Sequence, residues 1–398
     1  MRLLIISNMS HYRRKGRIVG WGPTVLEIDQ LASLFDEVRH VACLSDEEAP
    51  PSTLPYGSDR VSVVGVRPAG GESLASKLQV AWRSPKYLFT IWRELAGADC
   101  VHIRCPANIS LIAILLLSLL RSPRLRWVKY AGNWQPTGPE AWSYTFQRWW
   151  LARNLHRGLV SVNGEWRDQP AHVRSFLNPC LTDAELKEGE AIGLAKELGS
   201  PVRLLFVGRV EAEKGCGRVI ELARDLRTRG MSVVLDVVGD GPERHRFESL
   251  AAESGLSPHV RFWGWLPRPE ITRLYSEAHF LVLPSVCSEG WPKVLSEAMA
   301  YGVIPLASTV SCIPQYLEKF RTGRAFDAYD GGAFVGAIEW YRANGLEWKN
   351  EAVRAMESAR LFSYVKYLTA VRRLLSFDGA GVSDESLRPD HGASRKAQ

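Results

Sequence analysis

The sequence predicts an α/β protein of two doubly wound domains, each a parallel sheet with helices on both faces. Short apolar runs alternate with amphipathic stretches through both halves of the chain. This alternation lapses once, in the polar stretch 182–200 after Asn178-Pro179, which indicates a boundary. The length of 398 residues, 46% of them hydrophobic, is enough to bury two cores.

Eleven short apolar runs are expected to form the strands, with helices filling the gaps between them. In the first half they are Leu3–Ser7, Val38–Leu44, Val61–Gly65, Cys100–Ile103, Trp127–Tyr130 and Leu159–Val162. In the second half they are Arg203–Val207, Val233–Val238, His259–Phe262, Phe280–Leu283 and Val303–Leu306.

These runs divide the chain into a first domain over residues 1–180 and a second over 200–358. Leu361, Tyr364, Leu368 and Val371 recur at helical spacing, which predicts an amphipathic helix over 359–377 that packs on a body already formed. Residues 378–398 are rich in polar residues and glycine without apolar periodicity, so we expect a disordered tail.

Cysteine usage and the apolar segments favour a cytoplasmic protein. The seven cysteines are scattered without C-x-x-C spacing, which argues against a disulfide framework and a structural zinc site. The apolar run Ile109–Leu120 has about twelve residues where a membrane span needs roughly twenty, so a buried helix is expected. The N-terminal run Leu3–Ile6 is too short for a signal peptide.

The formal charge of +7 favours an anionic partner, such as a nucleotide, a phospholipid surface or nucleic acid. Nucleic acid is not expected, because no recognisable module interleaves aromatic with basic residues. Arg121, Arg124 and Arg126 follow the longest apolar run, where they could touch anionic lipid head groups at the inner face of a membrane. The simpler interpretation is that the apolar run forms a buried core helix and that the basic residues only follow its end.

The segment 288–302 carries two glutamates eight residues apart, directly after the apolar run 280–283. Pro292 favours the first turn of a helix, which places Glu289 in a loop above the sheet and Glu297 on the second turn. The free N–H groups of such a helix start would suit a diphosphate, and the carboxylates would suit sugar hydroxyls. Alternatively, both are solvated residues that stabilise the helix dipole.

Two further segments follow strands of the second half. Gly208 allows close backbone approach, and Arg209 and Lys214 could clamp a diphosphate in place of a metal ion, or pair with nearby glutamates on the surface. Gly239 opens a Gly-Asp-Gly-Pro turn that could bring the backbone near a ligand or serve as an ordinary turn.

In this order and spacing, the three segments resemble the family 4 retaining glycosyltransferases of the GT-B fold, strongly over 203–323 and weakly in the first half. The resemblance implies two Rossmann-like domains facing an interdomain cleft, with the last helix crossing back to the N-terminal domain. It also implies a hexosyltransferase that uses a UDP- or GDP-sugar, needs no metal or other cofactor, and extends a glycan or lipid-linked glycan in surface polysaccharide synthesis.

The same resemblance assigns roles to residues of this chain. Glu289 would lie beside the transferred sugar with Arg209 and Lys214 at the diphosphate as the catalytic set, while Glu297 would hold the ribose. Backbone N–H groups toward the donor would come from Gly290, Trp291, Lys293 and Val294. The chain departs from the family pattern at Pro292, where glycine is frequent, and at Ser311–Gln315, which replaces Gly-Gly-Ile-Pro-Glu.

In the first half, Gly22 lies in the stretch 20–24 after the first strand and resembles the family's glycine loop. An ordinary loop with Pro23 opening a helix fits as well. Arg13, Arg14 and Lys15 lie in the loop expected after the first strand and are candidates for an anionic acceptor, or form a solvated loop. The histidine that many relatives carry after the fifth strand is absent from 128–133.

Two other classes stay open on sequence alone. One is an epimerase or phosphorylase of the same fold, and the other is a non-catalytic sugar-nucleotide-binding protein. The base and sugar of the donor, the acceptor, the linkage and the oligomeric state are not specified by these motifs.

Overall fold

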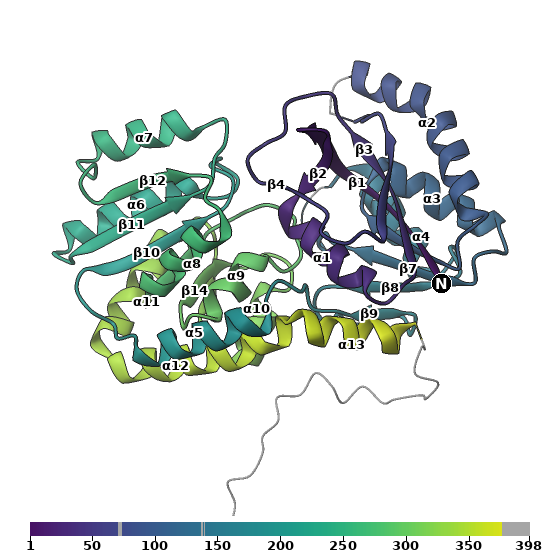
Figure 1. Ribbon diagram of the computed structural model, residues 1–398. Helices are drawn as coiled ribbons and strands as arrows, with labels where there is room; N and C mark the ends of the chain where they lie inside the picture. Colours follow the sequence, from purple (N-terminus) through teal and green to yellow (C-terminus); the bar gives the residue numbers. More distant parts are fainter. Residues whose placement is uncertain (71–73, 137, 139, 376–398) are drawn as a thin grey trace, which may run out of the picture.

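The computed structural model describes residues 1–70, 74–136, 138 and 140–375, which fold into two α/β bodies that face each other (Figure 1). Among these residues one sheet has nine strands and the other six. The predicted α/β class with two doubly wound domains is confirmed. The tail expected over 378–398 lies outside the described residues.

The first sheet is parallel along its centre, in the order β5-β3-β1-β6-β7-β8-β9. The second half of β1 pairs antiparallel with β2, which in turn pairs with β4. The order reverses beside β1, so loops leaving β1 and β6 border a crevice. The strands are β1 (Arg2–Arg14), β2 (Arg17–Trp21), β3 (Glu37–Leu44), β4 (Thr53–Pro55), β5 (Val61–Val66), β6 (Cys100–Cys105), β7 (Leu125–Tyr130), β8 (Leu159–Val162) and β9 (Val173–Ser175).

Helices cover both faces of this sheet. One face packs against α2 (Leu74–Leu95), α3 (Asn108–Leu119) and α4 (Trp142–Ala152) around a core that contains Ile91, Ile114 and Leu151. The other face packs against α1 (Gly22–Ala32). The run expected at Ile109–Leu120 is α3, and in the part of the chain that the structure describes, no helix is long and apolar enough to cross a membrane.

The second sheet is wholly parallel, in the order β12-β11-β10-β13-β14-β15, and reverses between β10 and β13. Its strands are β10 (Val202–Val207), β11 (Val233–Val238), β12 (Val260–Gly264), β13 (Phe280–Leu283), β14 (Ile304–Ser308) and β15 (Arg324–Phe326). Its helices are α5 (Asp183–Ala195), α6 (Cys216–Thr228), α7 (Arg244–Glu253), α8 (Arg268–Glu277), α9 (Lys293–Met299), α10 (Ile313–Phe320), α11 (Gly331–Ala343) and α12 (Gly345–Ala359).

The polar stretch 182–200 is mostly helical. Thr182 and Glu185 form a capping box that starts α5. An added Cβ at Gly189 would lie 2.3 Å from the carbonyl oxygen of Ala300, so α5 packs closely on the second body. The polarity that indicated a boundary therefore belongs to the exposed face of a helix.

The chain crosses between the bodies twice, and the two crossings are hydrogen-bonded to each other. Cys180 donates its N–H to the carbonyl of Phe362 at 3.0 Å, and Tyr364 donates to Leu181 at 2.9 Å. After the short 3₁₀ turn η1 (Arg360–Phe362), α13 (Tyr364–Leu374) returns to the first body (Figure 1). Val371 of α13 is buried in the same core as α1, which confirms the predicted return of the last helix.

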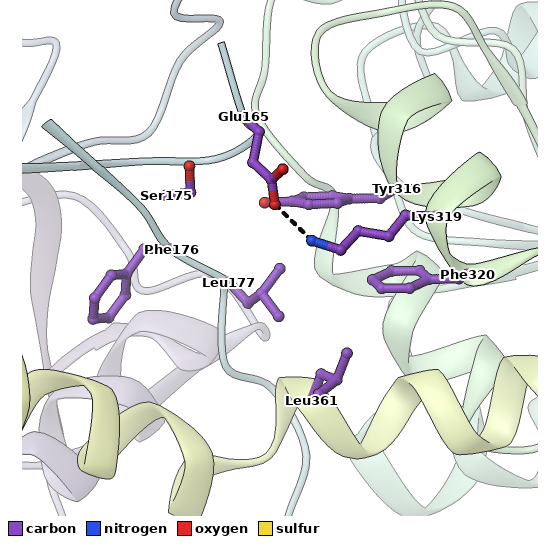
Figure 2. Close-up of a pocket in the computed structure, with 8 residues that line it drawn as sticks. All are labelled: Glu165, Ser175, Phe176, Leu177, Tyr316, Lys319, Phe320 and Leu361. Carbon is purple, nitrogen blue, oxygen red and sulfur yellow. Dashed lines mark hydrogen bonds and ion pairs between the residues drawn. The ribbon is translucent and has the colours of Figure 1, made fainter. Parts of the chain in front are cut away.

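A small hollow beside the crossings is shared by both bodies. Figure 2 shows that its side chains come from the end of the first sheet, from α10 and from the second crossing. Lys319 of α10 pairs with Glu165 across it at 2.6 Å. The residues around the hollow are Glu165, Ser175, Phe176, Leu177, Tyr316, Lys319, Phe320 and Leu361.

The region 12–24 differs from the prediction. Tyr12 to Arg17 were expected in a loop, but β1 continues to Arg14 and turns tightly into β2 at Lys15-Gly16, both at positive φ. Gly22 follows β2 and is the first residue of α1. The second half of β1 is mostly polar and β2 has only 5 residues, so periodicity missed the hairpin.

Among the residues that the structure describes, five histidines are buried: His11, His40, His102, His156 and His279. Burial lowers the pKa of each, to about 4 for His156 and His279. The folded protein therefore keeps neutral several groups that the unfolded chain protonates near pH 6.5.

We expect the free energy of unfolding to decrease as the pH falls from 6.5 toward about 4, because the unfolded chain binds more protons in this window. Each histidine contributes a slope of at most about 1.4 kcal/mol per pH unit. Urea unfolding across this pH range measures it. His245→Gln is the control, since that side chain is 98% exposed and should leave the slope unchanged. A flat profile would contradict the expectation.

Candidate functional site

The predicted site segments lie where the strand order of the second sheet reverses. The loop after β10 carries Gly208 to Gly215, and the loop after β13 carries Pro284 to Pro292. Arg218 at the start of α6 joins the loops, because its guanidinium donates to the carbonyl of Pro284 at 2.7 and 2.9 Å. This is the edge at which open parallel sheets bind ligands.

Glycine is required where these loops approach one another. Gly239, after β11, has a φ of +125°, and an added Cβ would lie 1.9 Å from the carbonyl oxygen of Gly208. Gly215 has a φ of +91°, and its Cβ would lie 2.4 Å from the carbonyl oxygen of Pro284. Close packing of the turns therefore accounts for these glycines before any ligand is considered.

Lys214 and Glu289 meet at the centre of the edge. Their Nζ and Oε1 atoms lie 2.6 Å apart, and the side chains are 19% and 30% exposed. The sequence separates them by 75 residues, so only the parallel packing of β10 and β13 unites them. The predicted catalytic cation and carboxylate form one half-buried ion pair that solvent can reach.

Arg209 lies on the same loop but faces solvent. Its guanidinium is 69% exposed and pairs with Glu211 at 3.0 Å, which is the surface alternative considered for it. Exposed pairs of this kind contribute little to stability. The guanidinium is thus positioned at the site edge without being fixed there.

Glu297 has other partners than Glu289. It is buried, its Oε1 lies 2.6 Å from the guanidinium of Arg268, and its Oε2 accepts a hydrogen bond from the Tyr275 hydroxyl at 3.0 Å. Arg268 also binds Glu185 on α5 and the carbonyl of Cys180. Glu297 is therefore part of a network that reaches the first crossing between the bodies.

The stretch Gly290–Val294 makes contacts that sequence reasoning did not give. The N–H of Gly290 donates to the carbonyl of Ala131 in the first body at 3.1 Å. Trp291 is 2% exposed, stacks on Phe362 and donates to Ser296, so its side chain belongs to the core. Pro292 is the N-cap of α9, one residue before the helix position predicted for it.

In the first body, Gly22 packs tightly, with its N–H donating to the carbonyl of Ser52 at 3.0 Å. The predicted acceptor residues separate: Arg13 and Lys15 are exposed, whereas Arg14 binds the backbone carbonyls of Ala49 and Thr53. The guanidinium of Arg14 thus fixes β4 and the residues before it beside the hairpin.

A buried charge cluster between the bodies was missed by the sequence analysis. Glu27 of α1 is fully buried, and its Oε1 accepts from Arg104 at 2.8 Å and from Lys129 at 2.7 Å. Its Oε2 accepts from Lys293 of the second body at 2.8 Å, and Lys293 also donates to the carbonyl of Pro23. Lys293, predicted at the donor, therefore directs its side chain to the first body.

The electrostatics of this cluster follow from its charges. Burial alone would raise the pKa of Glu27, but Arg104, Lys129 and Lys293 hold it well below its usual value. Burial lowers the pKa of Lys129 to about 7 against the attraction of Glu27. A signal was available in the sequence, since Arg104 and Lys129 are cations near the ends of strands whose other residues are mostly apolar, but it did not identify their shared partner.

Among the described residues, no group of three or more His, Cys, Asp or Glu side chains is arranged to hold a metal ion.

We expect Glu27→Gln to lower the free energy of unfolding by about 3–5 kcal/mol, because it leaves buried cations without their carboxylate. Lys293→Met should cost less, since Glu27 keeps two partners. Urea unfolding measures both. Glu190→Gln, which removes an exposed pair with Arg360, is the control and should cost about 0–1 kcal/mol. A Glu27→Gln protein as stable as the parent would refute the account.

Comparisons with known proteins give the family and the fold that this chain resembles. Residues 195–361 match the model of the family described as glycosyl transferases group 1. A putative colanic acid biosynthesis glycosyltransferase, WcaL of Salmonella typhimurium, is 33% identical over 169 residues, which cover 41% of either chain. The amylovoran biosynthesis glycosyltransferase AmsK of Erwinia amylovora is 34% identical over 135 residues, 33% of either chain. The matched region thus spans less than half the length of these relatives.

Solved structures match over nearly the whole chain. Sucrose-phosphate synthase from Thermosynechococcus elongatus aligns with a TM-score of 0.69 at 18% identity, over 95% of this chain and all of that one. Anabaena Alr3699/HepE in complex with UDP and glucose aligns with a TM-score of 0.62 at 16% identity over the same shares. At these identities the likeness concerns the fold, which is GT-B. The chain thus has the GT-B fold, and its residues 195–361 match the group 1 glycosyl transferase family.

Proposed function

We propose that this protein is a retaining, metal-independent glycosyltransferase that moves a sugar from a UDP- or GDP-sugar to a glycan or lipid-linked glycan at the cytoplasmic face of a membrane. Support for the setting comes from relatives named for colanic acid and amylovoran biosynthesis. Support for a nucleotide-sugar donor comes from the similar fold that holds UDP and glucose. The observation that carries the proposal is the Lys214–Glu289 pair at the sheet edge.

Lys214 supplies the charge that the leaving diphosphate requires. As the bond to the sugar breaks, negative charge grows on the diphosphate, and a fixed ammonium nearby stabilises it. Glu289 holds Lys214 at this position and, once the ammonium turns to the phosphates, its carboxylate accepts hydroxyl hydrogen bonds from the sugar. Arg209 adds a second cation by leaving its weak surface pair.

Glu297 serves the ribose in this proposal. Each of its oxygens accepts one bond from the protein, and a carboxylate oxygen has room for a second. The ribose hydroxyls would therefore add to the network with Arg268 and Tyr275 rather than displace it. Gly208, Gly239 and the α9 start provide the close backbone approach, with Val294 at the first turn of α9.

The acceptor lies on the side of the first body. Arg13 and Lys15, exposed at the tip of the β1–β2 hairpin, are proposed as contacts for an anionic acceptor, and Gly22 lies at the start of α1 beyond the same hairpin. Arg14 is excluded from this role because its guanidinium binds backbone carbonyls.

We expect Lys214→Ala to lower kcat by about 10²- to 10³-fold, as the loss of a preorganised charge contact typically does. Glu289→Gln should lower it as well. Turnover of radiolabelled donor by the purified protein measures this, and Lys187→Ala on exposed α5 is the matched control. Undiminished turnover in both site variants would refute the site assignment, and donor binding without any turnover would favour the non-catalytic class.

We also expect EDTA to leave turnover unchanged and the product to keep the anomeric configuration of the donor. The physical reason for the first is that Arg209 and Lys214 provide the charge that a divalent ion would otherwise supply. Proton NMR of the fresh product assigns its anomer. Loss of activity in EDTA that Mg²⁺ restores would contradict metal independence, and an inverted anomer would contradict retention.

A further inference from the structure

Helix α2 has two apolar faces, of which the fold covers one. Tyr87, Ile91 and Leu95 point into the core of the first body and are at most 2% exposed. A helix of a globular protein ordinarily carries one apolar stripe, toward the core, with polar residues opposite. The outer face of α2 departs from this pattern.

Four large apolar side chains follow one line along that outer face. Leu78, Trp82, Phe89 and Trp92 are 67%, 86%, 59% and 53% exposed. Their spacings of four, seven and three residues place them on the same side of the helix. We call this row the α2 stripe. Single exposed hydrophobic residues are ordinary, but a contiguous row marks a surface that binds something.

The surroundings of the α2 stripe are basic. Lys86 and Arg93 on α2 are exposed, whereas Glu94, the helix's single acidic residue, is buried and paired with Arg2, Arg39 and Arg93. The two helices that complete this layer, α3 and α4, contain no acidic residue. The outer side of the layer thus combines apolar rows with positive charge.

Helix α4 and the segment after α3 carry the same combination of aromatic and basic side chains. On α4, Trp142 stacks on Phe146 and Phe146 on Trp149, and Trp142 is 73% exposed. Arg153 lies 4.5 Å above the Trp149 ring. After α3, Arg121 and Arg124 are exposed. Because α3 packs against both α2 and α4, these groups belong to one helical layer (Figure 1).

We propose that the α2 stripe docks the first body on an anionic bilayer, with α2 lying in the plane of the interface. Tryptophan and phenylalanine enter the boundary between head groups and acyl chains, and Lys86, Arg93, Arg121 and Arg124 attract anionic head groups. The inference rests on the membrane setting of the proposed function and identifies the surface of the protein that makes this contact. Arg126, expected at such a contact, is excluded because it is buried against the carbonyls of Leu117 and Pro123.

Charge favours this occupant over two others. A second copy docked through the same face would oppose cation with cation. Nucleic acid would match the cations but would leave the aromatic row without a partner, because its interfaces are mainly polar. A bilayer with anionic lipids offers an apolar environment to the aromatic row and negative charge to the cations beside it.

Pelleting of the full chain with phosphatidylcholine vesicles, with or without phosphatidylglycerol, tests the proposal. We expect binding to vesicles that contain phosphatidylglycerol and weak binding to phosphatidylcholine alone. The triple change Trp82→Ala, Phe89→Ala, Trp92→Ala should lower the partition coefficient at least about tenfold, since three inserted rings are lost. Lys86→Gln and Arg121→Gln should each lower it about fivefold. Trp265→Ala, on the second body and 40% exposed, is the matched control.

Three results would overturn the proposal: no pelleting with anionic vesicles, pelleting that the triple variant leaves unchanged, or a dimer in sedimentation without lipid that the triple variant abolishes. Thermal melting confirms that the variants fold, as expected for substitutions at exposed positions. Donor hydrolysis in the absence of lipid separates this inference from the proposed reaction. A stripe variant that hydrolyses donor normally but does not pellet supports the docking surface, and vesicle binding without sugar transfer refutes the reaction alone.

Discussion

The buried carboxylate of Glu27 is the interaction on which the relation of the two bodies depends. It lies near the reversal of strand order in the first sheet, where it forms ion pairs with Arg104 of β6 and Lys129 of β7. A third ion pair joins it to Lys293 of α9, the helix that starts beside the candidate donor site. A carboxylate in such a place is stable only while its partners surround it. The ion pair with Lys293 therefore links the position of α9 to that of α1, and the first turn of α9 is held by the first body.

The rest of the interdomain contact is arranged around that link. Gly290 binds the backbone of Ala131 above it, and the paired crossings at Leu181 and Ser363 close the opposite side. The Arg268–Glu297 pair ties the ribose candidate to the first crossing through Glu185. A change in the angle between the bodies would have to break several of these polar contacts together, so the candidate-site residues of the two bodies are mechanically coupled.

The candidate site itself depends on close packing of glycine turns. Gly239 against Gly208 and Gly215 against Pro284 leave no space for a side chain, and this brings the loops after β10, β11 and β13 to one edge. Lys214 and Glu289 pair because of that convergence. Glu297, which the spacing of eight residues had suggested as a companion of Glu289, instead has its own network, because it lies on α9 and binds Arg268 and Tyr275 of α8.

The sequence by itself determined the α/β class, eleven of the strands, the last amphipathic helix and the segments that form the candidate site, because apolar periodicity and glycine turns are local properties of the chain. It missed the β1–β2 hairpin, where the second half of β1 is mostly polar and β2 is short, and it did not give the helix α5 within the polar stretch 182–200. Only the tertiary structure decided which charges meet: Lys214 with Glu289, Lys293 with Glu27, Arg14 with backbone carbonyls. Such pairings join residues far apart in the chain, and their energy depends on burial and distance, which no local pattern encodes.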